Sequence, residues 1–545
     1  AYNYVDRNTT VNHLSDTQGE HGSHVAGIAT ANRYIRSGST YVEAASNAGA
    51  VGMAPDAQLI IMKVFGSGGG ASDSDYMAAI EDAIVLGCDA VNLSLGSSVQ
   101  GFTFSDGYQD ILNKLTDTAL NEKLVVSISA GNSYAFTQFT DTDLYIEDVN
   151  MHTGGSPGTY INSLCVAAAY NTITTGCPLV FNGSRNVFYD ESTEGDDGTA
   201  YSNPAMTTIA SSNSYTYVYI DALGTAADYS EVNSAVSLSG KIVIINRGDI
   251  TFSEKGNNVK NYSPKALIVA NNQSGTILMN LADFTGRFPM VSIKLADANA
   301  IKAGAASSGT TSSGITYYTG PVRVTNVEES FVADRRDATV TEFSSWGIPG
   351  SLIMKPEITA PGGNIYSVNG THRTSGGTAG GTSAYEYMSG TSMAAPHITG
   401  LSAVVAQYLR ENDIDALNPE LIDNYSIRAI VQSLLMSTAT PMQNDGEYVS
   451  LLQQGAGLAD VSAAVRSRSV LMLNSEDETL TAKTGAAADG KVKAELGDDP
   501  EKTGSYTYSF SLYNLTGASL EYELTTELFT QVRYAAEGYG AFMDT

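Results

Sequence analysis

The chain has 545 residues, a formal net charge of −29 and an apolar fraction of 42%. This length predicts about three or four domains, and the apolar content is sufficient for packed cores. The acidic composition argues against nucleic-acid binding, because phosphate recognition needs clustered Lys and Arg. It is typical of a secreted or cell-surface protein that must stay soluble.

Cysteine content and hydropathy narrow the class of protein further. Cys88 and Cys165 lie in apolar sequence that predicts burial, and with Cys177 they predict no disulfide framework. No run of about eighteen apolar residues occurs, so no membrane span is predicted. No signal peptide is visible at Ala1, as expected of a secreted protein that has lost it. The carboxylates would suit a structural calcium ion, although no EF-hand loop is present.

The first predicted helix begins at a histidine. Residues 20–29 (EHGSHVAGIA) place His21 before Gly and small residues, which indicates a closely packed helix to about Arg33. His21 and His24 form an H-x-x-H pair, but no Glu follows His21 and no third ligand is near. No zinc site is therefore predicted, and His24 is interpreted as a packed helix residue.

Three apolar runs predict buried strands of βαβ units: one within residues 51–65, where turn residues lead into the run, one at residues 89–96, and one at residues 124–133, which contains β-branched residues. The third run ends in a Gly-Asn turn. Helices are predicted at 72–86 and 109–121, and a further strand of the same sheet at 156–166. The Gly-rich loop at 66–70 lacks a following G-K-[ST], so a phosphate site is not favoured.

The character of the sequence changes between about Thr207 and Tyr318. Apolar runs closed by turn residues predict three strands there, at 239–248, 265–272 and 288–293. A helix is predicted to follow at about 295–303. The stretch carries no Ser-His-Asp chemistry, so it is predicted to be an insert outside the catalytic machinery, and an inert insertion remains an alternative to a binding role.

Residues 381–400 (GTSAYEYMSGTSMAAPHITG) place Ser392 at the start of a predicted helix. Unpaired backbone N–H groups and the positive end of the helix dipole lie at such a position. Both stabilise an oxyanion, so the position suits a nucleophilic serine. In an isolated motif of this kind, however, the serine is more often an ordinary N-cap.

The segments HGSHVAGIA, SAGNS and SGTSMAAPHITG resemble the three hallmark motifs of the subtilisin-like serine proteases, in that family's order. The resemblance implies an α/β fold in which helices flank a parallel sheet. It implies that Ser392 is the nucleophile and His21 the general base. It also implies that Asn132 donates its side-chain amide to the oxyanion, beside the backbone N–H of Ser392.

The same resemblance implies a substrate cleft with two walls. One wall would pair with an extended substrate backbone as an added strand, and it comprises Ser94, Leu95 and Gly96. The other would border the primary side-chain pocket, and it comprises Ser129, Ala130 and Gly131.

The third catalytic residue of the family, an Asp, precedes the His in the chain and is usually followed by a small residue and Gly. Asp6 lacks that sequel, and Asp16 lies only five residues before His21, too close for a separate strand. We therefore expect the catalytic Asp upstream of this chain. It would lie in a removed segment or in a cleaved N-terminal fragment that stays associated as a partner.

Three domains are predicted, in four segments of the chain. Residues 1–206 and 319–467 would be the two parts of the catalytic domain. Residues 207–318 resemble a protease-associated (PA) domain, a small α/β insert of some subtilases, mainly through the segment GKIVIINRG. Residues 468–545 alternate apolar and polar residues and resemble an incomplete fibronectin-III-like β-sandwich. This combination is most similar to the Gram-positive cell-envelope proteinases, the lactocepin and C5a-peptidase group.

The function that these features predict is a secreted or cell-surface serine endopeptidase acting on protein or peptide substrates through an acyl-enzyme. No cofactor is required by such chemistry, and neither nucleic acid nor a membrane is an expected partner. The alternative is a non-catalytic surface protein that keeps the subtilase scaffold for binding. A D-[ST]-G-like turn in an upstream segment would favour the enzyme.

Overall fold

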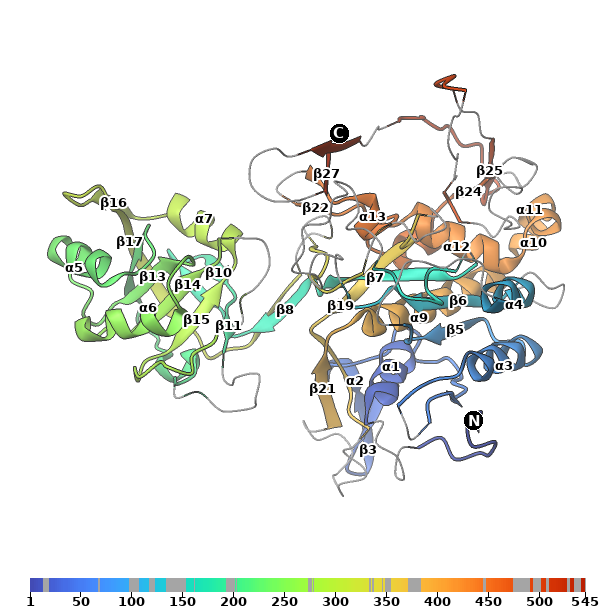
Figure 1. Cartoon of the computed structure of the whole chain (residues 1–545), viewed down its shortest axis with the longest axis horizontal. Helices are drawn as coiled ribbons and strands as arrows, with labels where there is room; N and C mark the ends of the chain where they lie inside the picture. Colours follow the sequence, from blue (N-terminus) through green and yellow to red (C-terminus); the bar gives the residue numbers. More distant parts are fainter. Residues whose placement is uncertain are drawn as a thin grey trace. The chain divides into compact units, whose positions relative to one another are not determined.

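A computed structural model divides the chain into two compact units, one of residues 1–172 with 334–545 and one of residues 173–333 (Figure 1). The structure describes residues 1–12, 19–66, 69–97, 107–116, 123–133, 153–160, 162–192, 201, 203–272, 277, 279–332, 335, 338–345, 347, 354–370, 384–444, 447–473, 491–493, 501–505, 509–526, 530–533 and 541–544.

The first unit is built on a four-stranded parallel sheet. Its strands are β5 (Ala90–Leu93), β6 (Val125–Ser129), β7 (Leu164–Tyr170) and β19 (Ile358–Gly363), in the order β19-β7-β6-β5. Parallel strands need cover on both faces, and accordingly β6 is buried along its whole length. The predicted α/β fold with a parallel sheet and flanking helices is confirmed.

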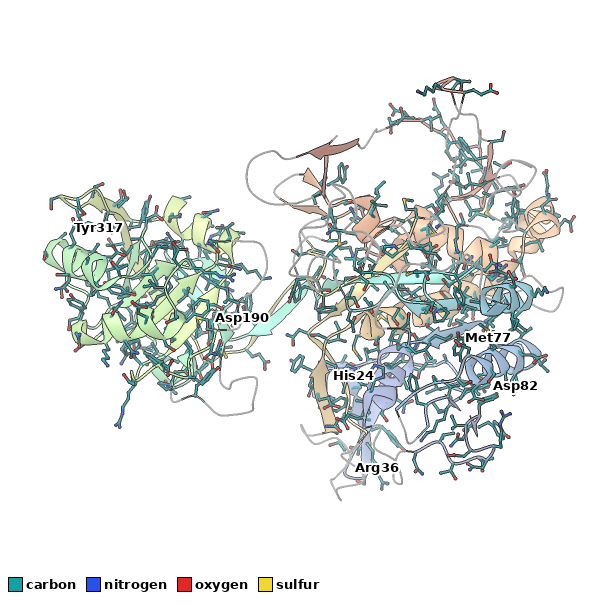
Figure 2. The ribbon with its side chains drawn as sticks, viewed as in Figure 1. His24, Arg36, Met77, Asp82, Asp190 and Tyr317 are labelled. Carbon is teal, nitrogen blue, oxygen red and sulfur yellow. The ribbon has the colours of Figure 1, made fainter. Side chains whose placement is uncertain are left out.

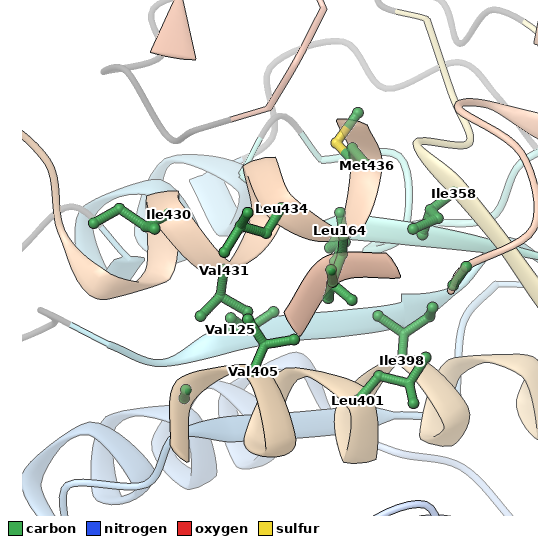
Figure 3. Packing of buried hydrophobic residues seen from close by; sticks show 14 of the residues in the cluster. Val125, Leu164, Ile358, Ile398, Leu401, Val405, Ile430, Val431, Leu434 and Met436 are labelled. Carbon is green, nitrogen blue, oxygen red and sulfur yellow. The ribbon is translucent and has the colours of Figure 1, made fainter. Parts of the chain in front are cut away.

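The two faces of this sheet carry different helices. Val125 packs with residues of α9 (Thr391–Glu411) and α12 (Ile427–Ser437), as Figure 3 shows. Val126 and Ile128 lie instead in the core of α3 (Asp73–Val85) and α4 (Gly107–Thr116). Successive side chains of a strand point to opposite faces, so one short run of residues serves both cores. α9 thereby lies along the sheet with the predicted nucleophile at its beginning.

The other elements of the first unit are short. They are β1 (Tyr2–Asn3), α1 (His21–Thr30), β2 (Tyr34–Ser37), β3 (Thr40–Glu43), α2 (Ala44–Asn47), β4 (Met62–Lys63), β20 (Ile365–Val368), β21 (Tyr385–Met388), α10 (Ile414–Leu417), α11 (Pro419–Asn424), β22 (Gln443–Asn444), β23 (Glu447–Tyr448), α13 (Leu451–Gln454), α14 (Val461–Arg466), β24 (Ser469–Leu473), β25 (Phe510–Asn514), β26 (Thr530–Arg533) and β27 (Ala541–Asp544). Among the described helices, none has the length and hydropathy needed to cross a membrane.

The second unit is a mixed nine-stranded sheet. Its strands are β9 (Leu179–Phe181), β10 (Arg185–Val187), β11 (Asp190–Glu191), β12 (Tyr215–Ile220), β13 (Ile242–Asn246), β14 (Ala266–Ala270), β15 (Met290–Ile293), β16 (Ser307–Thr310) and β17 (Thr316–Val324). β12 to β15 run parallel in sequence order, with α5 (Ala226–Ala235) and α6 (Phe252–Val259) packed on one face and α7 (Leu295–Ala303) on the other. β8 (Ile173–Gly176) and β18 (Glu329–Val332) form a separate pair, and η2 (Met206–Ile209) and η3 (Lys260–Tyr262) are single 3-10 turns.

The three strands predicted in the insert correspond to β13, β14 and β15, and the predicted helix is α7. The unit begins at Ile173 rather than at 207 and ends at Ala333 rather than at 318. The unit includes more residues than the predicted insert, because β9, β10 and β11, which precede residue 207, join the same sheet. The resemblance to a PA domain stays a prediction.

The described residues 469–473 and 510–515 belong to the first unit and contribute to its core. β24 pairs with β25, and Val470 and Met472 lie in the same core as α9 and α12. Ser433 on α12 donates a hydrogen bond to the carbonyl of Leu471. Among the described residues beyond this pair, β26 and β27 form a second hairpin. The fibronectin-III-like interpretation of residues 468–545 remains a prediction.

One expected strand is largely absent from the described structure. The apolar run ending at Phe65 predicts a buried strand, but only Met62 and Lys63 are extended, paired in parallel with β1. Leu59 and Ile60 are exposed. An apolar run shows that a segment prefers burial, whereas a strand also needs a neighbour to pair with.

Candidate active site

Ser392 is the second residue of α9. The helix begins after Gly390, whose backbone N–H donates to the carbonyl of Gly362 at the end of β19, over 2.8 Å. The hydroxyl of Ser94, just past β5, donates to the carbonyl of Ser392 over 2.6 Å. The Ser392 side chain is half-buried. Two strands of the parallel sheet thus fix the first turn of α9 while its serine side chain remains accessible.

Asn132 is held against this turn through its amide oxygen. Oδ1 accepts hydrogen bonds from the backbone N–H and the hydroxyl of Thr391, each over 2.9 Å. A backbone N–H can only donate, so the oxygen must face Thr391 and Nδ2 must point away from it. Nδ2 lies beside Gly390, where an added Cβ would be 3.3 Å from it. The geometry leaves an amide donor beside Gly390, two residues before Ser392.

The turn that carries Asn132 depends on a glycine. Gly131 follows β6 with a φ of 109°, a conformation that residues with a side chain rarely adopt. A Cβ there would also lie 2.9 Å from the hydroxyl oxygen of Ser345. The Gly131 N–H donates to the Thr391 hydroxyl over 3.1 Å. Thr391 therefore links the turn to the helix. Its place directly before Ser392 in the motif is the only sequence signal for this role.

His21 is the first residue of α1. α1 packs against α9 and β20 through Val25, Ile28 and Met393. The side chain of His21 reaches solvent, yet the surrounding protein removes part of its hydration and lowers its pKa below 6.5. Among the described residues, none forms a hydrogen bond with the His21 ring. An imidazole with a lowered pKa is neutral at pH 7, as a general base must be.

Two other histidines near this helix pair are structural. Figure 2 places His24 on α1, where it is fully buried with Nε2 3.0 Å from the carbonyl oxygen of Ile365. His397 is buried on α9, with Nδ1 2.8 Å from the carbonyl oxygen of Met393. Burial lowers the pKa of His397 to about 4. Both rings bond to backbone carbonyls, which agrees with the interpretation of His24 as a packed helix residue.

The two predicted cleft walls follow β5 and β6 and are tied together. The hydroxyl of Ser129 donates to the carbonyl of Leu95 over 3.1 Å. Ser129 and Ala130 are buried, whereas Gly96 is exposed. A Cβ on Gly96 would lie 3.2 Å from the carbonyl oxygen of Ser156. All six predicted wall residues thus lie at the carboxyl ends of neighbouring parallel strands, where α/β folds commonly bind ligands.

The structure offers His21 no aspartate of its own among the residues it describes. Asp6 is exposed and accepts a hydrogen bond from Nδ2 of Asn3 over 3.0 Å, within its own turn. Asp16 lies outside the described residues. Within the described sheet, β5 pairs only with β6, and Ala90 to Asn92 are only half-buried. An open edge of this kind presents unpaired backbone groups to an additional strand.

Residues 1–457 match the model of the subtilase family, Peptidase S8. The chain belongs to the subtilase family. It is 29% identical to the PII-type proteinase of Lactococcus lactis subsp. cremoris, over 98% of this chain and 26% of that protein. It is 28% identical to the minor extracellular protease Vpr of Bacillus subtilis, over 86% of this chain and 49% of that protein. The predicted membership of the family is confirmed.

Two further proteins of known type are similar to this chain. The chain is 26% identical to a C5a peptidase of Streptococcus pyogenes, over 84% of this chain and 34% of that protein. The predicted similarity to Gram-positive cell-envelope proteinases is thereby confirmed. A crystal structure of a psychrophilic subtilisin-like protease from an Antarctic Pseudoalteromonas covers 82% of this chain and 83% of its own, at 18% identity and a TM-score of 0.40. The chain thus spans between 26% and 49% of the length of these curated relatives.

Proposed function

We propose that the protein is an extracellular serine endopeptidase that cleaves peptide bonds in proteins or peptides through an acyl-enzyme on Ser392. The observation that carries this proposal is the orientation of Asn132. Thr391 donates to its amide oxygen, so its amide nitrogen points away from Thr391 and, among the described residues, is placed to bind an anion near the half-buried Ser392. A serine that only caps a helix needs no such amide donor, because no oxyanion forms beside it. The name of the Bacillus subtilis relative, minor extracellular protease Vpr, supports the extracellular location.

In the proposed reaction, the hydroxyl oxygen of Ser392 attacks the scissile carbonyl carbon while His21 accepts the hydroxyl proton. The backbone N–H of Ser392 and Nδ2 of Asn132 bind the oxyanion that forms. His21 then protonates the leaving amine, and a water molecule activated by the same imidazole hydrolyses the acyl-enzyme. No cofactor is required, because side chains and backbone supply every group. Within the described residues no three His, Cys, Asp or Glu side chains gather to hold a metal, so a structural calcium ion remains a prediction.

Substrate binding by strand addition belongs to the same proposal. An extended peptide laid along Ser94, Leu95 and Gly96 would gain main-chain hydrogen bonds without reading its sequence. Ser129 to Gly131 would form the opposite wall, held in place by the bond from Ser129 to Leu95. This mode of binding selects extended or unfolded segments of protein substrates.

We propose that the third catalytic group is an Asp on a segment outside residues 1–545, either a removed N-terminal segment or the protein's own cleaved N-terminal fragment. Two features support this. β5 has a free edge within the described sheet, and the apolar residues Leu59 and Ile60 are exposed although their sequence favours a buried strand. A strand added along β5 would cover backbone groups and carry a carboxylate to the carboxyl edge of the sheet, where Ser94 contacts α9.

Labelling with a fluorophosphonate probe tests the proposed activity. We expect covalent modification of Ser392 in the protein that carries its N-terminal segment, and none in Ser392→Ala. Ser389→Ala is the matched control, because Ser389 is exposed three residues earlier and should leave labelling unchanged. Well-folded protein with the N-terminal segment that fails to label would overturn the protease proposal and favour a binding protein on a subtilase scaffold.

Replacing Asn132 by leucine should reduce kcat for peptide hydrolysis roughly 100- to 1,000-fold. The amide donor acts on the oxyanion and not on the ground state, so KM should change little. Thr391→Val provides a graded comparison, because it removes the hydroxyl donor and keeps the backbone N–H that orients the Asn132 oxygen. A loss seen in KM with kcat preserved would contradict the assignment.

A further inference from the structure

A buried carboxylate in the first unit is surrounded by three lysines. Glu357 immediately precedes β19, and its side chain is fully buried. Its Oε1 lies 2.6 Å from Nζ of Lys355, 3.0 Å from Nζ of Lys493 and 3.4 Å from Nζ of Lys491. Oε2 accepts the backbone N–H of Cys165 on β7 over 2.7 Å. We call Glu357 with these three lysines the lysine clasp.

The clasp joins segments far apart in the chain. Lys355 is held to the four-stranded parallel sheet, because its Nζ donates to the carbonyl of Ser163, directly before β7, over 2.8 Å. Lys491 and Lys493 come from beyond the part of the chain that matches the family model, and Lys493 also donates to the carbonyl of Met354. Val492 between them packs on the core of α9 and α12. The side chains of Lys491 and Lys493 are 4% and 10% exposed, which is rare for lysine unless it is paired.

We propose that residues 491–493 form an ionic strap that fixes the later part of the chain to the base of β19, with Glu357 as its anchor. The opposite end of β19 carries Gly362, whose carbonyl holds Gly390 at the start of α9. The strap therefore braces the strand that positions the turn before Ser392. Electrostatic attraction holds the strap in place. The Glu357 carboxylate attracts Lys491 and Lys493, and burial keeps that attraction from being screened by salt.

Lysine footprinting tests the strap on the full chain. The protein is treated briefly with an amine-acylating reagent, and modification at each lysine is read by mass spectrometry. In the wild type we expect Lys491 and Lys493 to react far more slowly than Lys502, which is exposed. In Glu357→Gln we expect both to react at least about tenfold faster, because their buried partner charge is gone. Lys255 is the internal control, since it is buried in the second unit and should stay protected.

Two results would overturn the proposal. One is wild-type reactivity of Lys491 and Lys493 equal to that of Lys502. The other is unchanged protection of both in a Glu357→Gln protein that still melts cooperatively. If the Glu357→Gln protein does not fold, the variant Lys491→Met is tested in its place. Because Lys491→Met removes one of the two attractions that hold the strap, the proposal predicts faster modification of Lys493. Unchanged protection of Lys493 in this variant would contradict the proposal. None of these readouts depends on peptidase activity, so the outcome is separate from that of the proposed function.

Discussion

Replacing His21 by alanine is expected to lower kcat for peptide hydrolysis by roughly a million-fold in the complete protein. The serine hydroxyl is a weak nucleophile unless a base takes its proton, and among the described residues no other imidazole is free for that task. His24 and His397 are buried with ring nitrogens bonded to backbone carbonyls. The measurement is hydrolysis of a chromogenic peptide, with thermal melting to show that the variant is folded.

Non-additivity gives the sharper version of this test. When two groups act in one proton transfer, removing both costs no more than removing one. The double variant His21→Ala with Ser392→Ala should therefore retain the same residual activity as either single variant. This remaining activity would come from Asn132 and the backbone N–H of Ser392, which still stabilise the oxyanion. A His21→Ala protein within a hundredfold of the wild type, or a double variant far below both singles, would show that His21 is not the base.

Sequence alone predicted the parts of this site that local patterns encode. Apolar runs closed by turn residues located β6 and the insert strands, because a buried strand must be apolar and must end at a turn. The motif around Ser392 located the start of α9. The family is confirmed by the match over residues 1–457. The catalytic roles of Ser392, His21 and Asn132 stay predictions.

Other features could not be read from the sequence because they depend on contacts between distant segments. The bonds between Asn132 and Thr391 join residues 259 positions apart, and no periodicity reports such a pair. Lys491 and Lys493 look like solvated surface residues, and only the fold brings them to Glu357. Hydropathy at Leu59 and Ile60 indicated burial but could not say which strand would cover them.

Supplying the proposed Asp carboxylate should increase the rate of Ser392 labelling about 10,000-fold over that of residues 1–545 alone. The comparison is between the chain extended by the proposed Asp-bearing segment, or combined with that segment as a separate fragment, and the chain by itself. The Asp stabilises the imidazolium that forms when His21 accepts the proton, and it holds the ring in the reactive orientation. The Asp→Asn form of the added segment is the matched control, because it keeps the strand and removes only the charge.

The pH dependence separates the charge of this Asp from the stabilising effect of an added strand. In the chain alone, desolvation lowers the pKa of His21 below 6.5. Neutral imidazole is the active base, so labelling should persist below pH 6.5 and disappear only as the pH falls through that lowered pKa. A nearby carboxylate favours the charged His21 ring and raises its pKa. The acid limb of the pH profile of the labelling rate should therefore move to higher pH, while the plateau rate of labelling increases. The Asn control should leave the limb where it was. A faster plateau with an unmoved limb would mean that the added segment acts by ordering the sheet edge at β5 and not by supplying the third catalytic group.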